Sequence, residues 1–250
     1  MLNTTLYIII SVIIVSLISF IGAIALTINI KKLNKILIYL VSFAAGALLG
    51  DTFLHLIPEI SKNSGLTPNS SFLILAGVGV FFVLEKFAHW QHCHAHMTEE
   101  NHIHPFAYIN LIGDGLHNFI DGLIIAASYL ISIPVGIATT TAVALHEIPQ
   151  EIGDLGVLLH GGFTKGKAIL INFLSAIVSI AGAILIIFLG NIIENIQLIL
   201  IPIAAGSFIY IAGSDLIPEL HKETRPAKSF LQLIALIIGV AIMFFLTFLE

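Results

Sequence analysis

The sequence predicts an all-α polytopic membrane protein with eight transmembrane helices. Of its 250 residues, 58% are hydrophobic and 10% are charged, and the mean hydropathy is +1.04. A soluble domain is typically about half apolar and a quarter charged. The apolar runs are long and unbroken, which argues against the alternating strands of an outer-membrane barrel.

The same composition excludes several other classes of protein. A disordered chain has few apolar residues, and a disulfide scaffold needs several cysteines, whereas this chain has one. The net charge of −5 argues against a nucleic-acid partner. The lipid bilayer is therefore the expected environment.

Eight segments are long and apolar enough to cross a bilayer, which takes roughly 20 residues. The first is too long for a signal peptide and lacks a cationic start, so we expect it to stay in the protein. The segments lie near residues 4–30, 36–60, 70–88, 105–130, 134–159, 167–194, 196–221 and 228–249.

The basic residues predict the orientation. Only Lys62 follows an even-numbered segment. By the positive-inside rule, both termini lie outside, and the odd-numbered connections, including residues 89–104, lie in the cytoplasm. A compact chain of this kind favours a cell membrane, plasma or bacterial inner. The other basic residues follow or end odd-numbered segments: Lys31, Lys32, Lys35, Lys86, Lys165, Lys167, Lys222, Arg225 and Lys228.

A sequence repeat relates the second and seventh segments. Residues 44–59 read AAGALLGDTFLHLIPE and residues 204–219 read AAGSFIYIAGSDLIPE, 160 positions later. The two segments cross the membrane in opposite directions, which is typical of inverted-repeat transporters. We expect helices 1–3 and 6–8 to form the two halves, with helices 4 and 5 between them. Pro58 and Pro218 each remove a backbone bond and should kink their helices.

Ionisable side chains concentrate in the fourth and fifth segments, where each is costly and indicates a functional site. Imidazole, carboxylate and amide oxygen together favour a divalent cation such as Zn²⁺, Fe²⁺ or Mn²⁺. So many carboxylates can hold two adjacent ions. The residues are Asp114, His117, Asn118 and Asp121 in GDGLHNFIDG, and His146, Glu147, Gln150, Glu151 and Asp154 in HEIPQEIGD.

Three alternatives remain open at this point. The residues can form a hydrogen-bonded network that joins two helices, although no Lys or Arg in either segment neutralises the acids. They can serve another cation, with the carboxylates carrying protons. They can belong to an enzyme, but HEIPQ departs from the H-E-x-x-H zinc motif because Gln150 replaces the second His and Pro149 interrupts the helix. The prediction is a transporter and not an enzyme.

Other polar residues mark a candidate pathway or a second binding region. Glu59 and Glu219 precede connections, so each can instead be an interfacial, solvated residue. The pathway candidates are Asp114, His55, Glu59, Asp154, Asp215 and Glu219. The 89–104 loop is rich in histidine, which predicts weak metal binding, with a solvated linker as the alternative. Its histidines are His89, His92, His94, His96, His102 and His104.

The motifs HNFIDG at 117–122 and HEIPQE at 146–151 resemble the two signature motifs of the ZIP family of zinc–iron transporters. The resemblance implies ATP-independent uptake of Zn²⁺, Fe²⁺, Mn²⁺ or Cd²⁺ into the cytosol, movement of one group of helices against another, and a homodimer. It also implies two adjacent ion sites. The first comprises His117, Asp121, His146 and Gln150, with Asp51 as a further candidate; the second comprises Asn118, Asp121 and Glu147.

One position departs from the subfamily pattern, which usually has His where this chain has Gln150. The amide oxygen of Gln is a weaker, neutral ligand. The departure predicts a lower affinity for Zn²⁺ and a larger share for Fe²⁺ or Mn²⁺.

Overall fold

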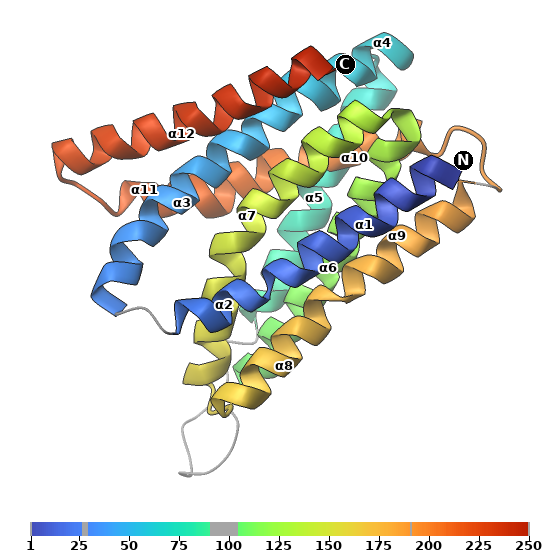
Figure 1. The fold of residues 1–250 in the computed structure, drawn as a ribbon. Coiled ribbons are helices and arrows are strands. Elements are labelled where there is room, and N and C mark those ends of the chain that lie inside the picture. The colour runs from blue at the N-terminus through green and yellow to red at the C-terminus, as the bar shows by residue number, and fades with distance from the viewer. Residues whose placement is uncertain (1, 27–29, 91–104, 191, 250) are drawn as a thin grey trace.

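The computed structural model describes residues 2–26, 30–90, 105–190 and 192–249, and within them it is helical with no strand (Figure 1). Most of the predicted histidine-rich loop, residues 91–104, lies outside the described residues. The first half contains α1 (Leu2–Ile18), α2 (Phe20–Ala25), α3 (Ile30–Asp51), η1 (Thr52–Leu56), α4 (Ile57–Asn63), α5 (Pro68–Trp90) and α6 (Pro105–Ile131). The second contains α7 (Ile133–His160), α8 (Lys165–Ala176), α9 (Val178–Leu189), α10 (Gln197–Tyr210), η3 (Ile211–Leu216), α11 (Ile217–His221), α12 (Pro226–Leu246) and η4 (Thr247–Leu249).

Six helices in the described part of the chain are long and apolar enough to cross a membrane, so this is an integral membrane protein. They are Asn3–Ala25, Ile36–Asn63, Pro68–Lys86, Lys165–Leu189, Gln197–His221 and Pro226–Leu246. The helices α6 and α7, with 27 and 28 residues, are as long as these but carry the predicted acids and histidines.

The chain ends and connections divide between two sides of the bundle (Figure 1). The two ends of the described chain lie on one side, together with the connections from α4 to α5, α6 to α7 and α9 to α10. The connections from α7 to α8 and from α11 to α12 lie on the opposite side. Two ends on the same side require an even number of passes through the bundle.

The helices α3 and α12 approach until their backbones touch. A Cβ added at Gly46 would lie 2.1 Å from the carbonyl oxygen of Leu236, and one at Gly239 would lie 2.2 Å from that of Phe43. No side chain fits at such a distance, because real Cβ atoms stay beyond 3.0 Å. Glycine therefore sets the spacing of this pair.

The helices α5 and α10 repeat this contact. A Cβ at Gly206 would lie 1.9 Å from the carbonyl oxygen of Ile74, and one at Gly77 would lie 2.1 Å from that of Ile203. Gly206 occupies the place of Gly46 in the repeated sequence. The same pair of close approaches thus occurs twice, each time between a helix from residues 1–90 and one from residues 197–246.

Two π-helical turns also recur at matching places. The turn η1 (Thr52–Leu56) precedes Pro58, and η3 (Ile211–Leu216) precedes Pro218. In both places the proline stands in the first turn of the next α-helix, where a missing N–H costs least. The predicted proline break thus takes the form of a π turn followed by a new α-helix.

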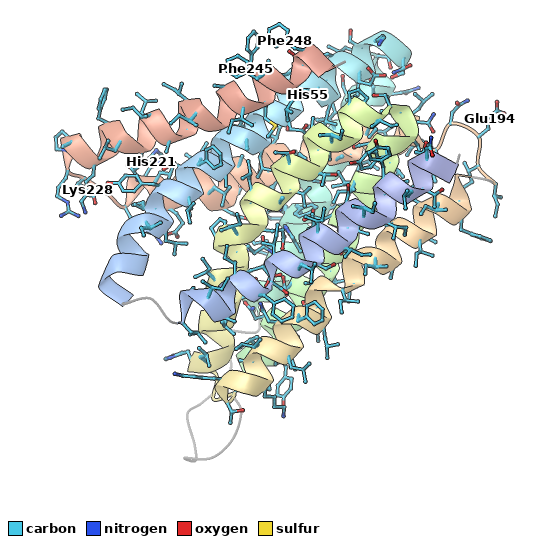
Figure 2. The ribbon with its side chains drawn as sticks, viewed as in Figure 1. His55, Glu194, His221, Lys228, Phe245 and Phe248 are labelled. Carbon is cyan, nitrogen blue, oxygen red and sulfur yellow. The ribbon has the colours of Figure 1, made fainter. Side chains whose placement is uncertain are left out.

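The helices α6 and α7 lie in the interior of the bundle. α6 packs on α9 and α7, and α7 also packs on α3 and α1. In contrast, only 17% of the most apolar stretch of α5, and of α12, is buried. The Phe245 and Phe248 side chains, where α12 and η4 meet, point away from the bundle (Figure 2). The most polar pair of helices is thus the one screened by apolar neighbours.

Candidate metal centre

The site is built on facing stretches of α6 and α7, which a connection at Ser132 turns back on one another. The Ser132 hydroxyl accepts the backbone N–H of Val135 at 3.2 Å and caps α7. His117 and Asp121 lie one turn apart on α6, as their spacing predicts. The next helix presents His146 and Glu147 to them.

These four side chains form a compact cluster, called the quartet below. One ligand atom from each of His117, Asp121, His146 and Glu147 lies within 4.8 Å of all the others. The Nε2 atoms of the two histidines are 3.2 Å apart. His146 Nε2 is 3.3 Å from Asp121 Oδ2, and His117 Nε2 is 3.5 Å from Glu147 Oε1. Four donors converge on one point, as a bound cation requires.

The quartet is sealed from water on most sides. Asp121, His146 and Glu147 are at most 1% exposed, and His117 is partly buried. The rings of Phe81 and Phe208 stand edge-on to His117 and His146, with centroids 5.4 Å and 6.1 Å away.

A backbone contact orients one of the histidines. His146 Nδ1 lies 3.2 Å from the Ala142 carbonyl oxygen. If Nδ1 donates to that carbonyl, Nε2 is left as the lone-pair atom facing the quartet, which is the usual preparation of a histidine ligand. The sequence alone did not reveal this contact.

The carboxylate oxygens of the quartet lack other partners. Among the described residues, neither oxygen of Asp121 nor of Glu147 accepts a hydrogen bond. A buried carboxylate without partners is costly, and α6 and α7 contain no Lys or Arg. These oxygens are suited to a cation.

The other predicted ligands lie outside the quartet. Asn118 Nδ2 donates to Asp114 Oδ1 at 2.9 Å, and its own Oδ1 has no hydrogen bond to any residue that the structure describes. Gln150 lies close enough to Asp114 for an amide–carboxylate contact. Glu151 accepts a hydrogen bond from Asn172 of α8. Asp51 Oδ2 accepts from Thr139 at 3.2 Å, two turns before His146 on α7.

The pathway candidates occupy different regions of the bundle. Asp154 accepts from Asn110 at 2.8 Å, one turn of α7 beyond Glu151. His55 Nε2 is 2.9 Å from the Met243 carbonyl oxygen, between η1 and α12. Glu59 and Glu219 each pair with a lysine three residues later, and Asp215 is half-buried in η3. The structure does not bring these residues into the quartet.

Helix α8 supplies polar groups that have only a weak signal in the sequence. Asn172 and Ser175 are buried and reach Glu151 and Asp114, respectively. Their spacing of one turn on an apolar helix is the only sequence signal. Gly122 brings α6 against α9 and not against α7, because a Cβ there would lie 1.8 Å from the Ser179 carbonyl oxygen on α9.

An integral membrane protein with a buried two-histidine, two-carboxylate cluster belongs to the class of metal-handling helical membrane proteins. The chain is a member of the ZIP zinc transporter family. The model of that family, described as ZIP Zinc transporter, matches residues 2–105 and 89–247, which cover nearly the whole chain. The resemblance drawn from the two motifs is therefore confirmed.

Curated relatives agree with this assignment. The chain is 34% identical over 218 residues to zinc transporter ZIP13 of Pongo abelii, covering 82% of this chain and 65% of that protein. It is 31% identical over 249 residues to ZIP13 of Mus musculus, covering 83% and 69%. It is 29% identical over 308 residues to SLC39A7 of Mus musculus, covering 89% and 65%. The chain thus spans about two thirds of their length, and all three are named as zinc transporters and not as enzymes.

Proposed function

We propose that this chain carries Zn²⁺, and with it Fe²⁺, Mn²⁺ or Cd²⁺, across a cell membrane into the cytosol through the quartet between α6 and α7. The observation that carries this proposal is the convergence of four ligand atoms within 4.8 Å at a buried position. The relatives named as zinc transporters support zinc as the principal cargo.

The donor set suits a borderline divalent ion. Two imidazoles and two carboxylates supply the four ligands that Zn²⁺ prefers, and Fe²⁺ and Mn²⁺ accept the same atoms. Within the described part of the chain, Asp121 and Glu147 each have a second carboxylate oxygen without a hydrogen bond, and the Asn118 amide oxygen also has none. These three oxygens support a second ion adjacent to the first, with Asp121 bridging.

Crossing the membrane eight times fits the arrangement of the bundle. The six apolar helices together with α6 and α7 make eight, and the chain ends lie on one side (Figure 1). The recurrence of the glycine contacts and the π turns supports an inverted repeat of helices 1–3 and 6–8. In that arrangement α6 and α7 are spans four and five, held between the two halves.

The orientation of the chain is proposed from the basic residues, and the direction of uptake from the family resemblance. Nine of the ten lie in or beside odd-numbered connections, which we assign to the cytoplasm. In one of these connections Arg225 binds Glu223 through two hydrogen bonds of 2.7 Å, and this contact lowers the pKa of Glu223 to about 2. The pairing does not alter the assignment, because acids contribute little to the positive-inside rule.

Reconstitution into liposomes tests the proposal. The full chain should carry Zn²⁺ into vesicles loaded with a fluorescent zinc indicator, and Fe²⁺, Mn²⁺ and Cd²⁺ in parallel assays. The variants His117→Ala and Asp121→Ala should abolish the flux, whereas Glu194→Gln, in an exposed connection, should not. Unchanged flux in both quartet variants would refute the site, and proton flux without metal flux would favour another cation.

Two further predictions belong with this function. The histidine-rich loop should bind metal weakly after uptake, and most of it lies outside the described residues. Assembly as a homodimer would cover part of the apolar surface on α5 and α12, and cross-linking in native membranes tests it.

A further inference from the structure

Polar side chains continue from the quartet along α6 and α7 in discrete layers. The first layer beyond it contains Asp114 and Glu151, and the second contains Asn110 and Asp154. At about 1.5 Å of rise per residue, neighbouring layers are roughly 5–6 Å apart. Along both helices, these layers lie between the quartet and the side of the bundle where the α7–α8 connection lies (Figure 1).

The first of these layers is enclosed by three helices. Asp114 on α6 is 6% exposed and Glu151 on α7 is 0% exposed. Ser175 donates to Asp114 and Asn172 donates to Glu151, both from α8. Every donor in this layer is an oxygen or an amide, and the layer contains no imidazole.

Two oxygens of this layer have no partner. Among the described residues, neither Glu151 Oε1 nor the Asn172 amide oxygen accepts a hydrogen bond, although both residues are at most 1% exposed. The Asn172 amide group contacts the Glu151 carboxylate, so its oxygen lies at the same place. A network formed only to join the helices would satisfy these oxygens.

We propose that Asp114, Glu151 and Asn172, with the Ser175 hydroxyl, form a separate cation site, called the oxygen site below, on the cytoplasmic side of the quartet and of the two adjacent ions proposed there. Two carboxylates, an amide oxygen and a hydroxyl suit hard divalent cations such as Mn²⁺. The proposed role of the oxygen site is to bind the transported ion after the ion leaves the quartet. This role rests on the proposed transport function.

The quartet and the oxygen site differ in their ligands, and this difference predicts a difference in their affinity for Zn²⁺. Zn²⁺ binds imidazole nitrogen better than neutral oxygen donors, so the quartet should hold it more tightly than the oxygen site does. An ion that leaves the quartet then meets a negatively charged but weaker site. The oxygen site would lower the free-energy cost of moving the ion out of the quartet and would still release the ion.

Binding of Mn²⁺ to the full chain in lipid nanodiscs tests the oxygen site directly. The starting protein is a quartet-null variant that carries His117→Ala, Asp121→Asn, His146→Ala and Glu147→Gln. Electron paramagnetic resonance of free Mn²⁺ should show that this protein still binds one ion. Adding Asp114→Asn or Glu151→Gln should weaken that binding at least tenfold, whereas adding Glu194→Gln, in an exposed connection at the far end of the bundle, should not (Figure 2).

A variant that gains affinity guards against loss of folding. Asn172→Asp adds a carboxylate of the same size and should tighten Mn²⁺ binding about tenfold. Absence of bound Mn²⁺ in the quartet-null protein, or equal affinity in all these variants, would overturn the oxygen site. Zinc flux by the unaltered chain is measured separately, so that failure of transport with Mn²⁺ still bound would refute the proposed function and leave the oxygen site standing.

Discussion

Asp121 makes the closest carboxylate contact within the quartet. Its Oδ2 lies 3.3 Å from His146 and 3.6 Å from His117, and it accepts no hydrogen bond among the described residues. A buried carboxylate in this position should contribute to metal binding and should destabilise the metal-free protein. The two effects can be measured separately.

The variant Asp121→Asn should weaken Zn²⁺ binding about 100-fold without lowering the stability of the metal-free protein. Zn²⁺ at 100 times the Kd of the unaltered protein should stabilise that protein by about 2.7 kcal/mol, and the variant by about 0.4 kcal/mol. Thermal unfolding in detergent with and without Zn²⁺ measures both quantities. Equal stabilisation of the two proteins would remove Asp121 from the site.

Gln150 is the position at which this chain departs from the subfamily motif, and it tests whether that position selects the metal. The structure places Gln150 against Asp114, one turn of α7 beyond His146, so an imidazole there would lie on the side of α7 that carries His146. The variant Gln150→His should raise the ratio of Zn²⁺ flux to Mn²⁺ flux about tenfold, because imidazole favours Zn²⁺. Competition assays in liposomes measure the ratio, and an unaltered ranking of the metals would show that this position does not select.

At the scale of the elements, the pairing of α5 with α10 depends on the absence of side chains at a few positions. A Cβ at Gly77 would lie 2.1 Å from the Ile203 carbonyl oxygen, whereas one at Gly79, on the same helix, would have no atom within 4 Å. The two glycines therefore form a matched pair for mutation.

The variant Gly77→Ala should destabilise the protein by about 1–3 kcal/mol, the usual cost of overpacking. Gly79→Ala should leave the stability unchanged or raise it slightly, because alanine favours the helix more than glycine does. Unfolding in detergent compares the two. Equal effects of both substitutions would show that the close approach of α5 and α10 is not required.

The whole molecule presents its chain ends on one side and its basic connections on the other. Figure 2 shows Lys228 and His221 at the opposite end of the bundle from Glu194. If the membrane lies across the bundle as proposed, Glu194 faces outside and Lys228 faces the cytoplasm.

Labelling of cysteines in intact cells tests this orientation. Cys93 is the single cysteine of the chain and falls in the predicted cytoplasmic loop, outside the described residues. A membrane-impermeant maleimide should not label it in intact cells but should label it in inverted vesicles. With Cys93→Ser as background, Glu194→Cys should show the opposite pattern, and the reverse result for both positions would invert the proposed orientation of the chain.

The sequence by itself determined the class of the molecule and indicated the candidate metal-ligating residues that the structure brings together. Apolar composition predicts membrane helices whatever their packing, and spacing of three or four residues places His117 and Asp121 on one face because a helix turns every 3.6 residues. The prediction of an all-helical membrane protein is confirmed. Six helices among the described residues are long and apolar enough to span a membrane, and the count of eight stays a prediction.

Only the tertiary structure decided which of the candidate residues meet. It selected His117, Asp121, His146 and Glu147 as the quartet, placed Gln150 and Asn118 against Asp114, and brought Asn172 and Ser175 of α8 to the acids of α6 and α7. It also paired α3 with α12 and α5 with α10 through glycines far apart in the sequence. Helical periodicity specifies neighbours along one helix, whereas contacts between helices depend on rotation and distance that only the packing of the whole bundle sets.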